Sequence, residues 1–189
     1  MKVRKIVLTG GPCAGKTTLT EVIARVFHSE VVVVPEAATL LFRGGFPRWT
    51  ETLVVEATQR AIYRVQLELE EAYSVRHPGK VLVLDRGTVD GAAYWPEGPL
   101  KFFEAMNSSL ESELTRYSRV LYMESAAKES YLIHKMKNPN RIENWEEAQR
   151  LDIETRKLWT SHPQMSVIHN EVSFGSKITQ VLDLVRAEI

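Results

Sequence analysis

Residues 3–18 of the chain are VRKIVLTGGPCAGKTT, and the class of fold can be inferred from this segment. Its β-branched start predicts a strand over Val3–Thr9, and the pattern that follows predicts a helix from Lys16 to about Phe27. Between them, residues 10–17 match G-x-x-x-x-G-K-[ST] in full. Glycines let successive N–H groups point into one concavity, which the positive end of the following helix also faces. The sequence therefore predicts a loop that binds phosphate groups.

This motif gives each polar side chain a task. Lys16 is predicted to reach the β- and γ-phosphates of a nucleoside triphosphate, and the Thr17 hydroxyl to bind Mg²⁺. A second Mg²⁺ ligand in such sites is an Asp after a neighbouring strand. Asp85 ends the apolar run Val81–Leu84 and fits that position, although an Asp there can also cap a helix. The predicted metal ligands are Thr17 and Asp85, and the predicted nucleotide-binding residues are Gly10, Gly11, Pro12, Cys13, Ala14, Gly15, Lys16, Thr17 and Thr18.

Short β-branched runs and longer helical patterns alternate along the rest of the chain. Strands are predicted over Val31–Val34, Val81–Leu84, Arg119–Met123 and Met165–His169, and helices over Thr50–Tyr73, around Leu100–Tyr117, and over Glu143–Trp159 and Ile178–Ile189. Strands separated by helices imply right-handed crossovers, and the valine run is typical of a parallel strand buried on both faces. We therefore expect an α/β fold: one domain over residues 1–189, a three-layer P-loop sandwich of about five parallel strands with helices on both faces.

Composition excludes several classes of protein. The 189 residues carry 24 Lys and Arg against 24 Asp and Glu, so a chain-wide basic surface for nucleic acid is absent. Apolar stretches are too short for a transmembrane helix, and the N-terminus lacks signal-peptide features, so we expect a cytoplasmic protein. Cys13 is the one cysteine, which excludes an internal disulfide, and we interpret it as a spacer in the loop.

The residue after Asp85 separates the kinds of P-loop protein. An ATP-driven motor normally places Glu there to polarise water, whereas this chain has Arg86, and it lacks the Asn/Thr-Lys-x-Asp motif of small GTPases. The remaining group is the P-loop kinases, which transfer a phosphoryl group to a small acceptor. Asp85-Arg86-Gly87 is similar to the Asp/Glu-Arg-Ser/Tyr signature of thymidylate and deoxynucleoside kinases. Arg86 can neutralise charge that develops on the transferred phosphoryl.

Glu36 is the candidate general base. It follows the second strand, where deoxynucleoside kinases carry the Glu that takes the proton of the acceptor hydroxyl. The alternative is a Glu at a helix N-terminus that only interacts with the helix dipole.

A lid is predicted over residues 134–145, which small kinases use to exclude water. The stretch from His134 carries three cations without an acid, and Arg141 is the preferred phosphate ligand because its guanidinium can bind in a bidentate manner. The alternative is a solvated basic helix end, compensated by Glu143, Glu146 and Glu147.

These motifs together resemble one family. Residues 10–18, VPEAAT at 34–39, DRGT at 85–88 and the stretch 138–152 are similar to a P-loop domain that is often labelled an AAA-type ATPase. That domain is shared by the TRPL translocation defect protein 14 group and the ribosylnicotinamide kinase module of the bacterial NAD-biosynthesis regulator. The resemblance implies ATP or GTP binding with Mg²⁺ on a kinase-like fold. Its members differ in activity, because the regulator's module phosphorylates a nucleoside and the other group is associated with nucleotide and phosphoinositide binding.

Two functions remain open at this stage. The first is a Mg²⁺-dependent kinase for a small acceptor such as a nucleoside or nucleotide, with Lys16, Glu36, Asp85, Arg86 and Arg141 as catalytic residues. The second is a nucleotide-dependent regulatory protein with slow or no turnover, whose partner is a protein or an anionic lipid; a plain NTPase is a further option. For the acceptor, binding roles and structural roles are both open for Arg48, Trp49, Gln59, Tyr94, Trp95 and Pro96.

Overall fold

A five-stranded parallel sheet forms the centre of the computed structural model, which describes residues 3–11, 13–125, 144–170 and 173–189. The strands are β1 (Lys5–Gly10), β2 (Val31–Val34), β3 (Val81–Asp85), β4 (Arg119–Met123) and β5 (Met165–Ile168). Their order in the sheet is β2-β3-β1-β4-β5, so β1 lies in the middle, hydrogen-bonded to β3 and β4. The predicted α/β fold with parallel strands is confirmed, and the first strand starts two residues later than predicted.

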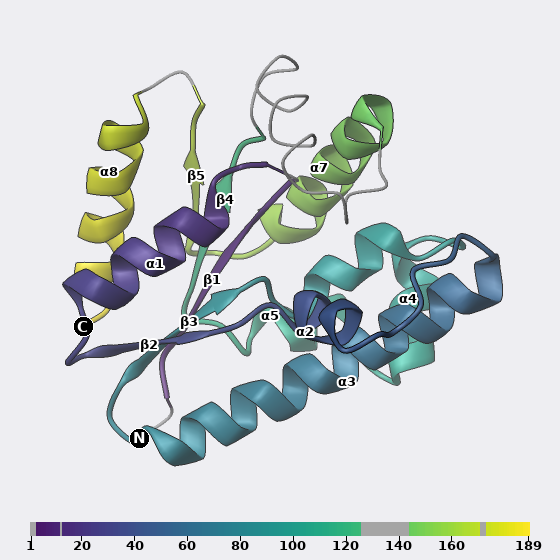
Figure 1. The fold of residues 1–189 in the computed structure, drawn as a ribbon, viewed down its shortest axis with the longest axis horizontal. Helices are drawn as coiled ribbons and strands as arrows, with labels where there is room; N and C mark the ends of the chain where they lie inside the picture. The colour runs from purple at the N-terminus through teal and green to yellow at the C-terminus, as the bar shows by residue number, and fades with distance from the viewer. Residues whose placement is uncertain (1–2, 12, 126–143, 171–172) are drawn as a thin grey trace.

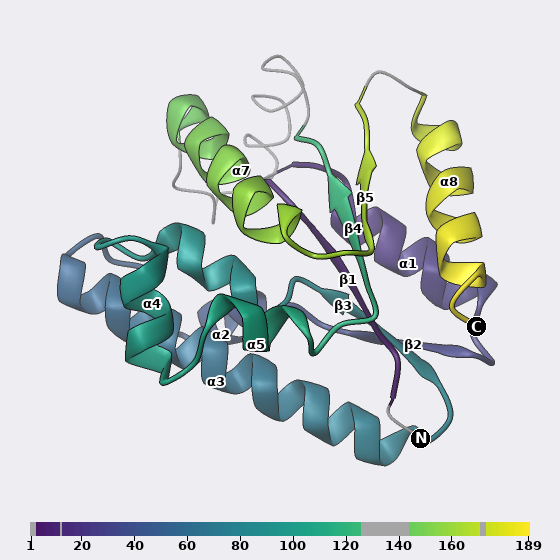
Figure 2. The same cartoon turned by 180° about the vertical axis from the view of Figure 1, so that it is seen from behind.

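Helices cover both faces of this sheet (Figures 1 and 2), and together with it they form three layers. On one face lie α1 (Lys16–Val26) and α8 (Phe174–Arg186). The other layer comprises α3 (Thr52–Arg76), the 3₁₀ helix η1 (Thr88–Tyr94), α4 (Pro99–Met106), α5 (Leu110–Leu114) and α7 (Trp145–Thr160). Ile6 and Leu8 pack beneath α1 and α8, whereas Val7 packs into the opposite core, as the alternation of side chains along a strand requires.

Two short elements were not predicted from the sequence. The helix α2 (Ala37–Arg43) follows β2, and η1 follows β3. Each has only seven residues, too few to produce a clear helical period in the sequence. Both begin at the carboxyl ends of strands, so they shape the surroundings of the predicted site.

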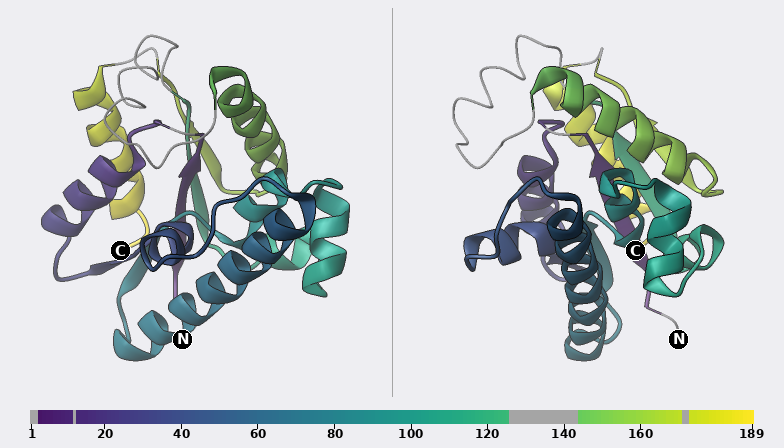
Figure 3. Two further views of the ribbon diagram at one scale, coloured as in Figure 1. Left: turned by 45° about the vertical axis from the view of Figure 1, so that its right-hand side comes forward. Right: turned by 90° about the vertical axis from the view of Figure 1, so that its right-hand side faces the viewer.

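The parallel sheet brings the motif-bearing segments to one edge. The loop after β1, Glu36 after β2 and Asp85 at the end of β3 all lie at carboxyl ends, which point the same way in a parallel sheet. Figure 3 shows β1 in the middle of the molecule, with α1 and α8 on one side and α7 on the other. The fold thus positions a site at this edge.

Several sequence predictions fall outside or at the limits of the described chain. Arg141 and residues 134–143 of the predicted lid lie outside the described residues, as does Pro12. Asn144 and Trp145, the last residues of that predicted lid, instead cap and begin α7. Within the described segments, no helix combines the length and the apolar character needed to cross a bilayer.

Candidate functional site

Glycines with positive φ angles lie at both ends of the loop between β1 and α1. Gly10 has φ 133°, and a Cβ there would lie 2.0 Å from the carbonyl oxygen of Met123, so only glycine fits. Gly15, which precedes the first turn of α1, has φ 85°. Cys13 also lies in the left-handed region, with φ 63°, a strained conformation for a residue with a side chain. The backbone at these described positions of the loop is therefore not extended.

Lys16 is folded over this loop. Its Nζ donates hydrogen bonds to the carbonyl oxygens of Gly10 and Gly11, at 2.9 and 2.8 Å. Burial, and then the neighbouring Arg86 guanidinium, lower the pKa of Lys16 to about 8. Thr17 and Thr18, the next residues of α1, are exposed. The ammonium group is thus held at the loop by two carbonyl oxygens. An anion whose oxygens accept hydrogen bonds more strongly than these carbonyls can replace them.

Asp85 has an oxygen that fits a cation. Its Oδ1 is buried and has no hydrogen-bond partner in the described part of the chain. Burial, and then the nearby Glu36 carboxylate, raise the pKa of Asp85 to about 6. A buried carboxylate oxygen without a partner is costly by itself, and a bound cation would remove that cost.

The donor set also fits magnesium. Within the described ranges, no three His, Cys, Asp or Glu side chains form a group that could hold a metal ion. Mg²⁺ is usually held by one or two carboxylates together with substrate phosphates and water, and not by an all-protein cage. One carboxylate from Asp85 and one hydroxyl from Thr17 match that mode of binding.

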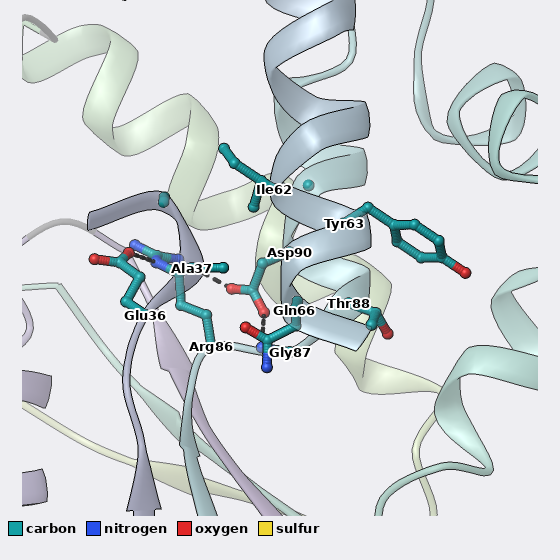
Figure 4. Close-up of a pocket in the computed structure, with 11 residues that line it drawn as sticks. Glu36, Ala37, Ile62, Tyr63, Gln66, Arg86, Gly87, Thr88 and Asp90 are labelled. Carbon is teal, nitrogen blue, oxygen red and sulfur yellow. Dashed lines mark hydrogen bonds and ion pairs between the residues drawn. The ribbon is translucent and has the colours of Figure 1, made fainter. Parts of the chain in front are cut away.

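Arg86 links the second and third strands. It has φ 71°, left-handed for an arginine, and its backbone N–H donates to the Leu8 carbonyl at 3.1 Å. Its Nε donates to Glu36 Oε1 at 2.8 Å and its Nη1 to Asp90 Oδ1 at 2.9 Å. Figure 4 shows the guanidinium between these two carboxylates. A strained backbone held by a buried charge network is typical of a functional position.

Glu36 is held as a carboxylate. Burial alone would raise the pKa of Glu36, but the Arg86 guanidinium, the Thr39 hydroxyl and Lys16 hold it below its usual value. Thr39 donates its hydroxyl hydrogen to Oε2, while Arg86 occupies Oε1. Glu36 is also the N-cap residue of α2, so its structural role and a chemical role are compatible.

Asp90 is a site residue that sequence reasoning missed. This buried residue of η1 accepts hydrogen bonds from the Thr9 hydroxyl, from Arg86 and from the Gly87 N–H, the last at 3.0 Å. Asp90 stands three residues after Gly87, as does the acidic residue of a capping box at the N-terminus of a helix. This spacing is the sequence signal that could have identified Asp90. Asp90 therefore fixes the turn that carries Arg86.

A pocket opens beside these charges. Its cavity has a volume of about 30 Å³, and it is lined by Glu36, Arg86 and Asp90 together with Ile62, Tyr63 and Gln66 of α3 (Figure 4). Ala37, Ala38, Gly87, Thr88 and Gly91 complete the lining. Gln66 was not singled out from the sequence, because a polar residue on a long helix is ordinarily solvated.

The other acceptor candidates do not line this pocket. Trp49 is 65% exposed, so the alternative that placed it in the core is wrong. Arg48 stacks on the Phe42 ring at 4.9 Å, and Trp95 packs in the core against Phe102. Gln59 is buried, with its amide oxygen near Gly91.

The structure therefore brings Lys16, Glu36, Asp85 and Arg86 together, as their mutual electrostatic influence indicates. Among the described residues, the two cations share the site with the carboxylates of Glu36, Asp85 and Asp90.

Comparison with known proteins supports the family and the fold. A family model described as an AAA domain matches residues 5–176, so the chain belongs to that family. The fold is similar to that of deoxyadenosine kinase from M. mycoides, solved with bound dATP. The two share 14% identity at a TM-score of 0.68, over 97% of this chain and 99% of that chain. A search of curated proteins found no match. The class is thus a P-loop domain with a kinase-like fold, and the more specific resemblance to the translocation-defect and NAD-regulator group stays a prediction.

Proposed function

We propose that the protein is a Mg²⁺-dependent phosphotransferase that moves the γ-phosphoryl group of ATP or GTP to a hydroxyl of a small acceptor such as a nucleoside or nucleotide. The observation that carries the proposal is the Glu36–Arg86–Asp90 network, which lines a pocket at the same edge of the sheet as the loop after β1. A hydrolase needs only the loop and a water, whereas a pocket with a carboxylate at its wall suits a second substrate.

The donor nucleotide would be bound by the loop N–H groups and Lys16. Lys16 would exchange the carbonyls of Gly10 and Gly11 for phosphate oxygens, which are stronger acceptors because they are charged. Thr17 and Asp85 would hold Mg²⁺, which when bound neutralises charge on the phosphates.

The acceptor would be activated from the pocket. Glu36 is ionised, lines the pocket and can accept the proton of a hydroxyl at its carboxylate. Arg86, held beside it, can stabilise charge on the phosphoryl group during transfer. The kinase-like fold supports this assignment of roles.

The test is an acceptor panel. The protein is incubated with Mg²⁺ and ATP or GTP and a set of nucleosides, nucleotides and small hydroxyl-bearing metabolites. Release of ADP or GDP and formation of phosphorylated acceptor are both followed. Turnover that rises with one acceptor, with equal amounts of both products, supports the kinase. Nucleoside diphosphate release without any phosphorylated acceptor contradicts it and favours an NTPase.

One observation favours the second candidate, a regulatory protein with slow turnover. Both oxygens of Glu36 are engaged, by Arg86 and Thr39, and its lowered pKa makes it a weak base. Under this function the protein binds nucleotide tightly, no acceptor stimulates turnover, and a protein or anionic-lipid partner binds differently with and without nucleotide. Vesicles with and without phosphoinositide, each with and without nucleotide, test the lipid arm.

Asp85→Asn is expected to separate stability from metal binding. The raised pKa of Asp85 means that its charge opposes folding at neutral pH, so the nucleotide-free variant should melt about 2–6 °C higher than the wild type. The same change should remove most of the Mg²⁺-dependent gain in nucleotide affinity. Thermal melts and calorimetry with and without Mg²⁺ measure both effects. Asp183→Asn, an exposed acid on α8 paired with Arg186, is the matched control. A lower melting temperature with unchanged Mg²⁺ dependence would contradict the assignment.

Nucleotide affinity of the free protein is expected to be highest between about pH 6 and pH 8. The pKa of Asp85 is raised to about 6, so Asp85 loses its negative charge below this pH range. The pKa of Lys16 is lowered to about 8, so Lys16 loses its positive charge above the range.

Stability of the nucleotide-free protein should change in the opposite sense. Both pKa shifts mean that folding disfavours the charged forms, so the contribution of Asp85 to the free energy of unfolding should increase as pH falls below about 6, and that of Lys16 as pH rises above about 8. Calorimetric titrations and melts across pH 5–10 measure both properties. In Asp85→Asn, the loss of nucleotide affinity below about pH 6 should be reduced to the part caused by titration of the nucleotide itself. An unchanged loss of affinity at acidic pH would contradict the role of Asp85.

A further inference from the structure

The side chain of Asp152 joins α7 to the phosphate-binding loop. Its Oδ1 accepts a hydrogen bond from the Gly11 N–H at 2.9 Å. The same oxygen accepts the hydroxyl hydrogen of Tyr122, which also approaches the Asp152 carbonyl oxygen at 2.7 Å. Tyr122 lies on β4 and is fully buried. One carboxylate thus ties together the loop after β1, the neighbouring strand and a helix far along the chain.

The contact between Asp152 and the loop is tight. A Cβ at Gly11 would lie 2.7 Å from Asp152 Oδ1 and 2.8 Å from its Cβ. The side chain therefore lies directly against the backbone of the loop. Burial, and then the hydrogen bond to Asp152, raise the pKa of Tyr122, so its hydroxyl keeps the proton that it donates.

Farther along α7, the same face of the helix contacts the turn that carries Arg86. Trp159 lies seven positions after Asp152, on the same side of α7, and its ring is 3.0 Å from where a Cβ of Gly87 would lie. Seven residues of α-helix span about 10 Å. A rigid element of fixed length therefore touches both the phosphate-binding loop and the residue after Arg86.

The charge of Asp152 is the wrong sign for a phosphate ligand. A carboxylate beside the loop repels a bound triphosphate, so its electrostatic effect alone would weaken nucleotide binding. Any favourable effect of Asp152 must come from holding the loop in its binding shape. The direction of a mutational effect therefore distinguishes the two roles.

We propose that Asp152 is a positioning residue for the phosphate-binding loop, and that α7 sets the spacing between this loop and the Arg86 turn. This rests on the nucleotide-binding part of the proposed function and not on the identity of an acceptor. The loop would be pre-formed for the donor nucleotide, so the effect should appear in donor affinity and in the KM for the donor. Once nucleotide is bound, kcat should change little.

The test compares Asp152→Ala with Asp152→Asn. Alanine removes the acceptor for Gly11, and the Kd of Mg²⁺–ATP measured by calorimetry should rise about tenfold, as expected for loss of one hydrogen bond to a charged group. Asparagine keeps an oxygen at the same place, so its Kd should stay within about threefold of the wild type. In a turnover assay, alanine should raise the KM for ATP by a similar factor and leave kcat within about twofold.

Two further variants serve as controls for the Asp152 side chain. Glu154→Ala removes an acid from the surface of the same helix, where it pairs with Lys157, and should leave the Kd unchanged. Tyr122→Phe keeps the carboxylate but removes its second partner, so an intermediate increase in Kd is expected, and this variant replaces alanine if the latter does not fold.

Two results would overturn the inference. Tighter ATP binding by both Asp152 variants would show that the carboxylate acts only through its charge. An unchanged Kd in all variants, with lower melting temperatures, would show that Asp152 serves only the packing of α7. Because these measurements need no acceptor, a wild type that binds ATP but phosphorylates nothing would disprove the kinase and leave this inference standing.

Discussion

Lys16→Ala is expected to lower the affinity for ATP and GTP by at least about 100-fold. Its ammonium is the charged donor at the loop, and each hydrogen bond to a charged group contributes about 1.5–3 kcal/mol. Because the pKa of Lys16 is lowered by burial, its charge opposes folding at neutral pH. The nucleotide-free variant should therefore melt at or above the temperature of the wild type. Calorimetry with each nucleotide and thermal melts measure the two effects.

The matched control is Lys101→Ala. Lys101 is an exposed lysine of α4 that pairs with Glu104, and its loss should leave nucleotide binding unchanged. Unaltered nucleotide affinity in Lys16→Ala would contradict the kinase and the regulatory function alike, since both depend on this loop.

Glu36→Gln is expected to reduce acceptor-dependent turnover by about 10²–10³-fold, because general-base catalysis contributes an effect of this size. Nucleotide affinity should remain within about threefold, since Glu36 lies at the pocket and not in the loop. Glutamine keeps the shape of the side chain and an oxygen for the Arg86 Nε–H, so the network should survive with a weaker bond. Parallel measurement of phosphorylated acceptor and of nucleotide Kd separates the two properties.

Glu30→Gln serves as the control, because Glu30 is an exposed acid before β2. Full acceptor turnover in Glu36→Gln would exclude Glu36 as the base and leave Arg86 and the loop as the catalytic groups. A large loss of nucleotide affinity would instead place Glu36 among the determinants of donor binding.

The fold and the nucleotide loop could be predicted from local sequence. The glycines of the loop are needed by the backbone itself, as the φ angle of Gly10 and its closeness to Met123 show. Alternating β-branched runs and helical patterns are equally local signals, and they indicated about five parallel strands within one or two residues of the observed bounds. The short helices α2 and η1 were not predicted, because seven residues are too few to show a helical period.

The arrangement of the site depends on contacts between residues far apart in the chain, and no spacing in the sequence predicts such contacts. Arg86 meets Glu36 across 50 residues, and Asp152 meets Gly11 across 141. Trp49, an aromatic residue in a loop, was assigned a place in the core as one alternative, and the fold leaves it exposed.

The phosphate-binding loop, the parallel α/β architecture and the approximate ranges of the strands were therefore predictable from the amino-acid sequence, because these depend on backbone conformation and on the period of buried side chains. Which charges face one another became visible only in the three-dimensional structure. The stretch of residues 3–18 contains Lys16, yet the groups that shift the pKa of Lys16, the carboxylates that share its site and the helix that contacts its loop all come from segments distant in the chain. Charge–charge interactions and desolvation depend on distances in space, and these are fixed only when the sheet brings its carboxyl ends together.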